Sequence, residues 1–420
     1  MEAHFEPVEG YRYSIQIVLL CVFIYARTSC GLRTVVEILK TFEDVLGSVC
    51  GKAPSYTTVR NWVLKLGLSA YGDDKTQKEA YAIIQDESIT VNRQKLLLTL
   101  GIPSRHTGKP LTHSDAVVLD MRVADSHNKE DVRDAVDAAA EKVGRRPDYG
   151  VSDGGTNLQG GMALAEVSQH LDISHTLGNC MKAVYSEDED FKSLTQRLGK
   201  IRLQYHLTDI AWLLPPPNMR AIARFMNLAD WVEWGNRVLA NMGSLEQKAK
   251  EAFGFLEEYR SLLEELAVDI DAVRYVETVC KTRGFSMETY RDCSRYILFH
   301  VIGNAENRRV RLGLRMLDYL KNEARLLHLI SHAQNLSSDI IESNFGILKS
   351  KMSPNKLYGF TSQILLLPLY PRTIDYSVTD EQDFKVRLAN VKLKEIDAWA
   401  KDNLSRNWVK DRAKTLKKAS

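Results

Sequence analysis

The chain has 420 residues, of which 44% are hydrophobic and 26% are charged, and its formal net charge is +2. This composition is typical of soluble globular proteins of two or three domains, and so balanced a charge singles out no class of partner. The six cysteines lack Cys-x-x-Cys spacing, which gives no signal of a zinc or redox site and favours a reducing compartment over a disulfide framework.

The first 75 residues are predicted to form a small helical module. The apolar run Ile15–Ala26 is too short to span a bilayer and lacks a secretory cleavage site, so we expect a buried helix there. A second helix follows at residues 31–46, and a third begins after the N-cap Ser55 and ends at Gly67.

The outer face of this third helix carries side chains that can hydrogen-bond phosphates and base edges. They are Tyr56, Thr57, Thr58, Arg60, Asn61 and Lys65. Two interpretations stay open, because a helix-turn-helix that reads DNA and a helical bundle without a nucleic-acid role share this pattern.

The next segment changes from helical to strand periodicity. Strands are predicted at residues 80–91, 95–102 and 115–124, with a turn at Asn92-Arg93. A helix at 128–144 with a C-cap at Gly144 and a fourth strand at 148–153 follow. Three meandering strands and a crossover helix into a fourth predict a mixed α/β sheet with a right-handed crossover. A ribonuclease-H-like core begins in this order.

The rest of the chain is predicted to be almost entirely helical. Another helix is expected after Gly161, residues 182–334 form a long helical block, and a further helix carries Glu342. From Lys385 to Ser420 there are eleven Lys or Arg against four Asp or Glu. Such a basic end suits a polyanion, although it is also typical of solvated helices.

Three acidic residues are notable for their positions: Asp86 inside the first strand, Asp153 at the end of the fourth, and Glu342 on the late helix. In the predicted topology the first and fourth strands are neighbours, so the two aspartates lie close together and repel unless a cation lies between them. Two Mg²⁺ ions, for which Mn²⁺ can substitute, would satisfy these oxygen ligands.

Each acid has an alternative. Asp153 precedes two glycines, as ordinary turn residues do, and Asp120 in the third strand competes with Asp86 for the role of first acid. We favour Asp86, because the third strand is expected at the edge of the sheet. The glycines after Asp153 allow close backbone approach to a phosphate, but no Gly-Lys-Ser/Thr follows, so no nucleotide loop is predicted.

Two lysines follow Glu342. Lys349 is seven residues later and therefore lies on the same helical face, from which it can reach a DNA phosphate. Lys351 is predicted to contact DNA with it. The alternative for Lys349 is a solvated helix lysine.

Three stretches together resemble a known family. They are "IIQDESI", "GVSDGGTNL" and "SSDIIESNFGILKSK", and they are similar to the motifs of the DDE transposases of insertion sequences. The resemblance implies a ribonuclease-H-like core with Asp86, Asp153 and Glu342 as catalytic metal ligands. It implies that the protein binds transposon ends, cleaves DNA and joins the 3′-OH ends to target DNA as a dimer or higher oligomer. A bacterial, cytoplasmic, nucleoid-associated protein without membrane contact is expected.

The resemblance also gives a meaning to the helical block. Asp153 and Glu342 are 189 residues apart, much more than in compact members, and families such as the hAT elements carry an all-helical insertion there. In those families it helps to process hairpin-ended DNA, partly through a tryptophan, so Trp231 and Trp234 are candidates for base stacking. Packing in a helical core is the alternative. "DISHTLGNCMK" resembles a segment that follows the second Asp, which makes His175 either an accessory or a structural residue.

These expectations divide the chain into five parts. They are a helix-turn-helix DNA-binding domain (1–75), the first part of a ribonuclease-H-like core (76–181), an all-helical insertion domain (182–334), the last part of the core (335–375) and a basic helical C-terminal tail (376–420). The alternative functions are a nuclease of the same fold without strand transfer and a domesticated DNA-binding protein without catalysis.

Overall fold

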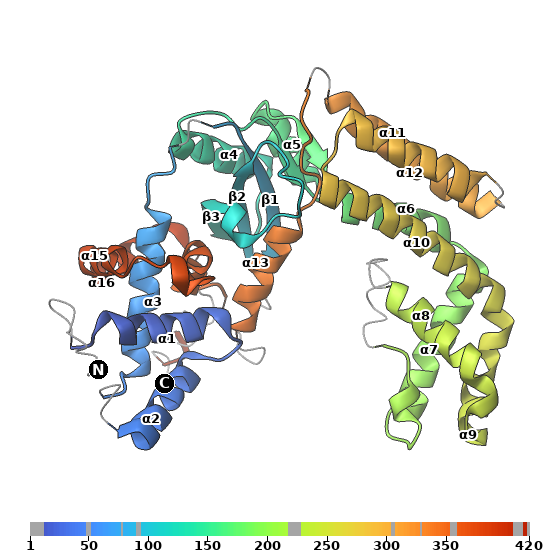
Figure 1. The fold of residues 1–420 in the computed structure, drawn as a ribbon, viewed down its shortest axis with the longest axis horizontal. Helices are drawn as coiled ribbons and strands as arrows, with labels where there is room; N and C mark the ends of the chain where they lie inside the picture. Colours follow the sequence, from blue (N-terminus) through green and yellow to red (C-terminus); the bar gives the residue numbers. More distant parts are fainter. Residues whose placement is uncertain are drawn as a thin grey trace. The chain divides into compact units, whose positions relative to one another are not determined.

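The computed structural model describes residues 12–47, 52–76, 79–89, 94–216, 228–303, 307–327, 330–352, 359–405 and 415–417. By its internal contacts the chain divides into two compact units (Figure 1). The first unit comprises Met1–Ser104, Leu111–Gln169 and Ser338–Ser420, and the second comprises Arg105–Pro110 and His170–Ser337. The predicted turn at Asn92-Arg93 lies outside the described residues.

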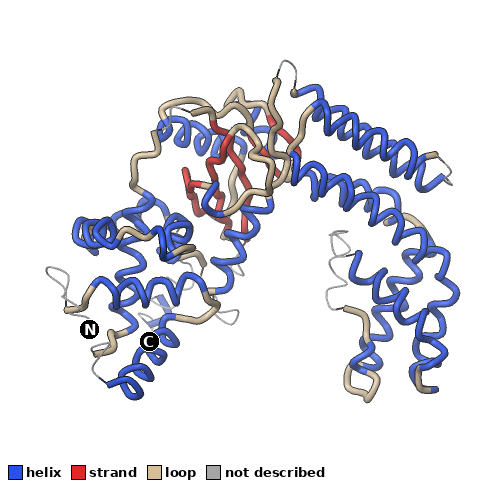
Figure 2. Tube along the Cα trace, in the orientation of Figure 1, coloured by secondary structure: helices blue, strands red, loops and turns tan. Residues whose placement is uncertain are grey.

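The first unit contains a five-stranded mixed sheet (Figure 2). Its strands are β1 (Tyr81–Ile89), β2 (Lys95–Pro103), β3 (Val117–Ala124), β4 (Gly150–Ser152) and β5 (Gln169–Leu171). Their spatial order is β3-β2-β1-β4-β5; β1 is antiparallel to β2, as β2 is to β3, and parallel to β4. The predicted mixed α/β sheet and the edge position of the third strand are confirmed.

Side chains alternate between two covered faces of this sheet, as the pleat requires. Ala82 and Ile84 face a core that includes side chains of α13 (Asp339–Ser350). Ile83 faces the other side, towards α4 (Lys129–Val143) and α5 (Thr156–Leu164). Near-continuous apolar strands such as β2 follow from burial on both faces.

The segment after Asp153 differs from the prediction. Helix α5 starts at Thr156 rather than after Gly161, and the short strand β5 follows it. A Cβ at Gly161 would lie 2.4 Å from Val132 Cβ, so this glycine allows α5 to pack closely on α4. β5 has only three residues, too few for the period of two to be recognised.

Three helices precede the sheet: α1 (Ile15–Arg27), α2 (Leu32–Leu46) and α3 (Tyr56–Tyr71). α1 is buried along most of its length, as predicted, and Ser55 caps α3 by accepting a hydrogen bond from the Thr58 N–H. The predicted stop at Gly67 is wrong. The helix continues through Gly67, where a Cβ would lie 2.2 Å from Leu365 O. This glycine therefore permits Leu365 to pack closely against the helix and does not end the helix.

The C-terminal helices pack against the same module. They are α14 (Leu366–Leu369), α15 (Glu381–Asn390) and α16 (Leu393–Asn403). Phe384 and Leu388 of α15 are buried in the core of α1–α3, and Ile396 of α16 is buried in the core of the sheet. The described part of the basic segment 376–420 is therefore largely built into the first unit.

The second unit is helical apart from its end of β5 and an isolated bridge at Phe285 and Gln334. Its helices are α6 (Ile173–Tyr185), α7 (Glu189–Tyr205), α8 (Leu228–Asn241), α9 (Gln247–Phe253), α10 (Arg260–Arg283), α11 (Met287–Tyr296) and α12 (Asn307–Leu326). Among the described residues, none of the helices is both long and apolar enough to cross a membrane.

Candidate active site

The predicted aspartates lie on, or directly after, two neighbouring strands. β1 and β4 run parallel, with Ile84 opposite Val151. Asp86 lies two residues beyond Ile84, inside β1, and Asp153 lies two residues beyond Val151, in the turn that follows β4. A step of two keeps Asp86 on the sheet face of Ile84, and neighbouring strands are about 4.8 Å apart.

The two aspartates differ in their surroundings. Asp86 is half-buried within β1, and its Oδ1 accepts a hydrogen bond of 2.7 Å from the Glu87 N–H. Asp153 is exposed, and its Oδ1 accepts one of 2.8 Å from the Gly155 N–H. Asp153 is therefore a turn residue, with Gly154 at φ +82°. Its Oδ2 makes no hydrogen bond within the described part of the chain, so the turn leaves an oxygen for a ligand.

Glu342 lies on the helix that covers the sheet face on which Asp86 lies. α13 packs on the sheet through Ile341 and Phe345, as predicted, while Glu342 in its first turn is exposed. The described residues contain no group of three or more His, Cys, Asp or Glu arranged to hold a metal ion. The structure therefore has Asp86 on β1, Asp153 directly after the neighbouring β4 and Glu342 on the covering helix, without a three-carboxylate cluster among the described residues.

His113 was not predicted and lies beside Glu342 in space. Its Nε2 is 3.0 Å from the Oγ of Ser343, and its ring packs edge-on against Tyr370 with centroids 4.8 Å apart. Burial lowers the pKa of His113 below its ordinary value, so the neutral imidazole is favoured. Nothing in the polar loop around His113 signals this contact in the sequence, because Ser343 is 230 residues away.

Asp120, the alternative first acid, lies on the edge strand β3 and is paired there. It is buried and forms a salt bridge of 2.7 Å to Arg122. Tyr71 of α3 also faces it, and burial followed by the charge of Asp120 raises the pKa of Tyr71. A carboxylate that is buried and paired in this way has a structural explanation, whereas Asp153 has an unused oxygen.

The predicted DNA-binding face of α3 is only partly accessible. Tyr56, Thr57 and Arg60 are exposed, and the guanidinium of Arg33 lies 5.3 Å from the ring centroid of Tyr56. Thr58 and Asn61 are half-buried, and Lys65 donates to the Leu388 carbonyl at 3.2 Å. The exposed set therefore belongs to the first turns of α3, because α14, α15 and α16 pack along the rest.

The two lysines after Glu342 have different surroundings. Lys349 is exposed, with its ammonium 5.9 Å from the ring centroid of Phe345. Lys351 is half-buried and donates to the backbone carbonyls of Tyr25 and Thr28. Lys349 remains accessible to a phosphate, whereas the ammonium of Lys351 is bound by the protein itself.

The remaining predicted residues lie in the second unit, where both tryptophans are packed. Trp231 is buried, and Trp234 donates its indole N–H to Leu213 O at 2.9 Å and packs edge-on against Phe253. Packing therefore explains both rings, and neither presents an open face that would support base stacking. The backbone N–H of His175 donates to the Asp172 carboxylate, which caps α6.

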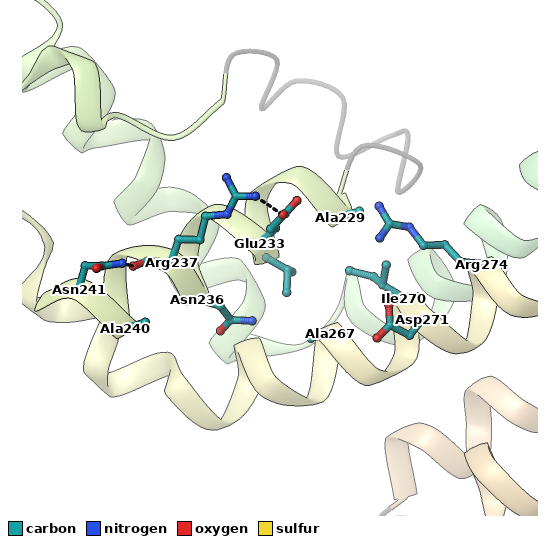
Figure 3. A pocket seen from close by; sticks show the side chains of 11 residues that line it. Ala229, Glu233, Asn236, Arg237, Ala240, Asn241, Ala267, Ile270, Asp271 and Arg274 are labelled. Atoms are coloured by element: carbon teal, nitrogen blue, oxygen red, sulfur yellow. Dashed lines mark hydrogen bonds and ion pairs between the residues drawn. The ribbon is translucent and has the colours of Figure 1, made fainter.

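The second unit also has a cavity of about 400 Å³ between α8 and α10 (Figure 3). Alanine and aliphatic side chains line its floor, and its polar rim is partly paired internally. Arg237 donates to Glu233, and Asn241 donates to the Arg237 carbonyl. This rim brings no nucleophile or acid–base pair together, so the sheet edge remains the candidate for catalysis.

The candidate site thus rests on strand register, on the helix that covers one sheet face and on the chemistry of the side chains. A scan against protein-family models and a search of curated proteins both found no match.

Proposed function

We propose that this protein is a DNA transposase that binds transposon ends, cleaves phosphodiester bonds and joins the resulting 3′-OH ends to target DNA. The observation that carries the proposal is the parallel pairing of β1, which carries Asp86, with β4, which Asp153 directly follows. The strand order β3-β2-β1-β4-β5, with β4 parallel to β1, supports a ribonuclease-H-like core. Fold alone does not imply function, so the proposal depends on the carboxylates.

The donor set fits hard divalent cations. Two carboxylates on adjacent strands repel each other in the absence of positive charge, and carboxylate oxygens are preferred ligands of Mg²⁺ and Mn²⁺. Asp86 and Asp153 would hold two ions, and Glu342 would complete the set from α13. When bound, two such ions activate the attacking oxygen and stabilise the leaving oxygen of an in-line displacement.

The protein's own residues hold and orient the DNA. The glycine turn after Asp153 fixes Oδ1 through the Gly155 N–H, and Oδ2 would be the oxygen that binds an ion. Lys349, exposed on α13, would contact a phosphate near the cut. The strength of such an electrostatic contact falls as the salt concentration rises. The exposed first turns of α3, with Tyr56, Thr57 and Arg60, would contact the transposon end.

The test is metal-dependent cleavage of a duplex carrying a transposon end. Asp153→Asn removes a charged ligand and keeps the turn acceptor, so we expect the cleavage rate to fall on the order of 10³-fold, since metal ions supply several kcal/mol of stabilisation. Asp137→Asn is the matched control, because Asp137 is a half-buried residue of α4 whose carboxylate pairs with Arg146 and Arg133 on the helix surface. Cleavage by Asp153→Asn at the wild-type rate would refute the assignment.

The same assay separates the alternatives. Cleavage without joined products would indicate a nuclease of this fold. End binding by the wild type without any metal-dependent cleavage would indicate a DNA-binding protein that has lost catalysis. Joined products that require Mg²⁺ or Mn²⁺ would support the transposase.

A further inference from the structure

The helix that carries Glu342 is joined at its far end to the N-terminal module (Figure 1). Lys351, the residue that follows α13, donates to the carbonyls of Tyr25 and Thr28 and lies 3.5 Å from that of Cys30. Its ammonium is also 4.6 Å from the ring centroid of Tyr25. These residues form the end of α1 and the turn after it, so Lys351 caps α1 from a position 326 residues away in the sequence.

Helix geometry explains why this contact is strong. The last carbonyls of a helix have no partner within the helix and carry a partial negative charge, which a cation satisfies. A charged donor makes hydrogen bonds about twice as strong as neutral ones. Lys351 is half-buried, and this burial lowers its pKa from the ordinary value. A lysine held in this way has few donors left for a DNA phosphate.

The other end of α13 is held as well. His113, in the loop before β3, contacts Ser343, the residue next to Glu342. Between the two ends, Ile341 and Phe345 pack on the sheet. The position of Glu342 along the sheet face is therefore set by a packed centre and two polar contacts, of which the Lys351 contact reaches α1; Ile347 of α13 also packs against the core that includes α1.

We propose that Lys351 is a positioning residue, which fixes α13 against the C-terminal end of α1 and thereby sets the place of Glu342 relative to Asp86 and Asp153. The proposal rests on the proposed function for its catalytic consequence, and on the described contacts alone for the anchoring itself. It replaces the prediction that Lys351 contacts DNA. It also makes α1–α3, which would bind the transposon end, mechanically continuous with the helix of the third acid.

Kinetics provide the first test. Lys351→Met keeps the aliphatic stem and removes the charge and all three donors. Displacement of a catalytic group by about 1 Å costs on the order of 10²-fold, so we expect the cleavage rate at saturating DNA to fall by about that factor while the dissociation constant for end DNA stays within about threefold of the wild type. Loss of a phosphate contact would instead weaken binding and reduce its salt dependence; that result would overturn the proposal.

Hydrogen exchange provides the second test and requires no catalysis. In Lys351→Met we expect the amides of α13 and of the last turn of α1 to exchange roughly tenfold faster or more, because the end of α1 loses a charged hydrogen-bond donor and α13 loses its attachment to α1. Lys192→Met is the control: this lysine lies on α7 in the second unit and bonds only exposed carboxylates. Unchanged exchange in Lys351→Met would overturn the anchoring, whether or not the wild type cleaves DNA.

A conservative variant guards against a general folding defect. Lys351→Arg retains a cation with several donors, so it should restore most of the protection of α13 and, with it, most of the cleavage rate. Faster exchange in Lys351→Met together with a wild-type cleavage rate would mean that the contact is merely structural and would refute the positioning role. A wild type that cleaves no end duplex would refute the proposed function and leave the exchange result to decide the anchoring.

Discussion

The two units use charged side chains in opposite ways. In the second unit, buried acids are paired inside the helical core: Asp269 is 0% exposed and accepts from Tyr185 at 2.6 Å and Arg309 at 2.9 Å. In the first unit, Asp153 and Glu342 are exposed at the carboxyl edge and on the covering helix of the sheet. Buried acids of the second unit such as Asp269 are therefore bound within its core, whereas Asp153 and Glu342 of the first unit are exposed and bury little surface.

The network around His170 extends this contrast. His170 is buried in the second unit, with Nδ1 2.6 Å from Glu323 and Nε2 2.6 Å from Gln334. Both ring nitrogens and a carboxylate are thus satisfied without water. Burying such polar groups alone costs free energy, and pairing them offsets that cost. A buried and paired histidine or acid of this kind is therefore explained by its role in the fold.

The largest effect on stability is expected from breaking a pair in the second unit. Arg309→Met leaves the buried Asp269 with Tyr185 as its main described partner, and removing one member of a buried ion pair costs about 3 to 5 kcal/mol. Asp153→Asn, by contrast, should change the free energy of unfolding by no more than about 0.5 kcal/mol. Urea unfolding followed by circular dichroism measures both. Equal effects of the two substitutions would remove the distinction between the units.

A second comparison concerns helix packing. Gly161→Ala places a Cβ 2.4 Å from Val132 Cβ, and such overpacking costs about 1 to 3 kcal/mol. Gly199→Ala is the matched control, since a Cβ there meets nothing within 4 Å in α7. It should stabilise the second unit by about 0.5 to 1 kcal/mol, because glycine is unfavourable inside a helix. A neutral Gly161→Ala would mean that α4 and α5 pack less closely than described.

A smaller effect should follow pH. Burial lowers the pKa of His113 in the first unit and of His106 in the second below the ordinary value of 6.5. Between the folded and unfolded pKa values the unfolded chain binds more protons, so stability is full above pH 6.5 and falls as the pH falls through this window. Unfolding measured from pH 8 to pH 5 should show a weaker decline for His113→Gln and for His106→Gln than for the wild type.

The smallest effect concerns thiols, for which the two units should behave alike. Burial raises the pKa of Cys21 to about 12 in the first unit and that of Cys180 to about 11 in the second. Both therefore remain protonated at pH 8, and iodoacetamide, which attacks the thiolate, should leave them unmodified. Among the cysteines that the structure describes, half-exposed Cys30 should react first, as peptide mass spectrometry would show. Early alkylation of Cys21 would contradict the burial of α1.

Sequence patterns predicted the elements that have long or regular periodicity. The helix α4 with its C-cap at Gly144, the strands β1 to β4 and the buried α1 are all confirmed. The patterns failed where a contact distant in sequence decides the outcome. Gly67 resembles a helix stop, yet Leu365 lies against it, and β5 is held in the sheet by pairing although it is too short to show a period.

The candidate site divides in the same way. The aspartates could be found in the sequence because Asp86 lies within a predicted strand and Asp153 at the end of another, and the sheet makes these two strands neighbours. His113 and the role of Lys351 could not be found, because their partners are 230 and 326 residues away and follow no local period.

The sequence by itself thus determined most of the strands and helices and the places of Asp86 and Asp153 on or directly after two strands, since side-chain periodicity and strand-end position are local properties. Only the tertiary structure decided which charged groups are committed to folding and which remain accessible. The sequence suggested that four side chains are accessible: Lys65, Lys351, Trp231 and Trp234. In the fold, each of them is bound or buried. Accessibility depends on contacts between distant segments, and no local pattern encodes those contacts.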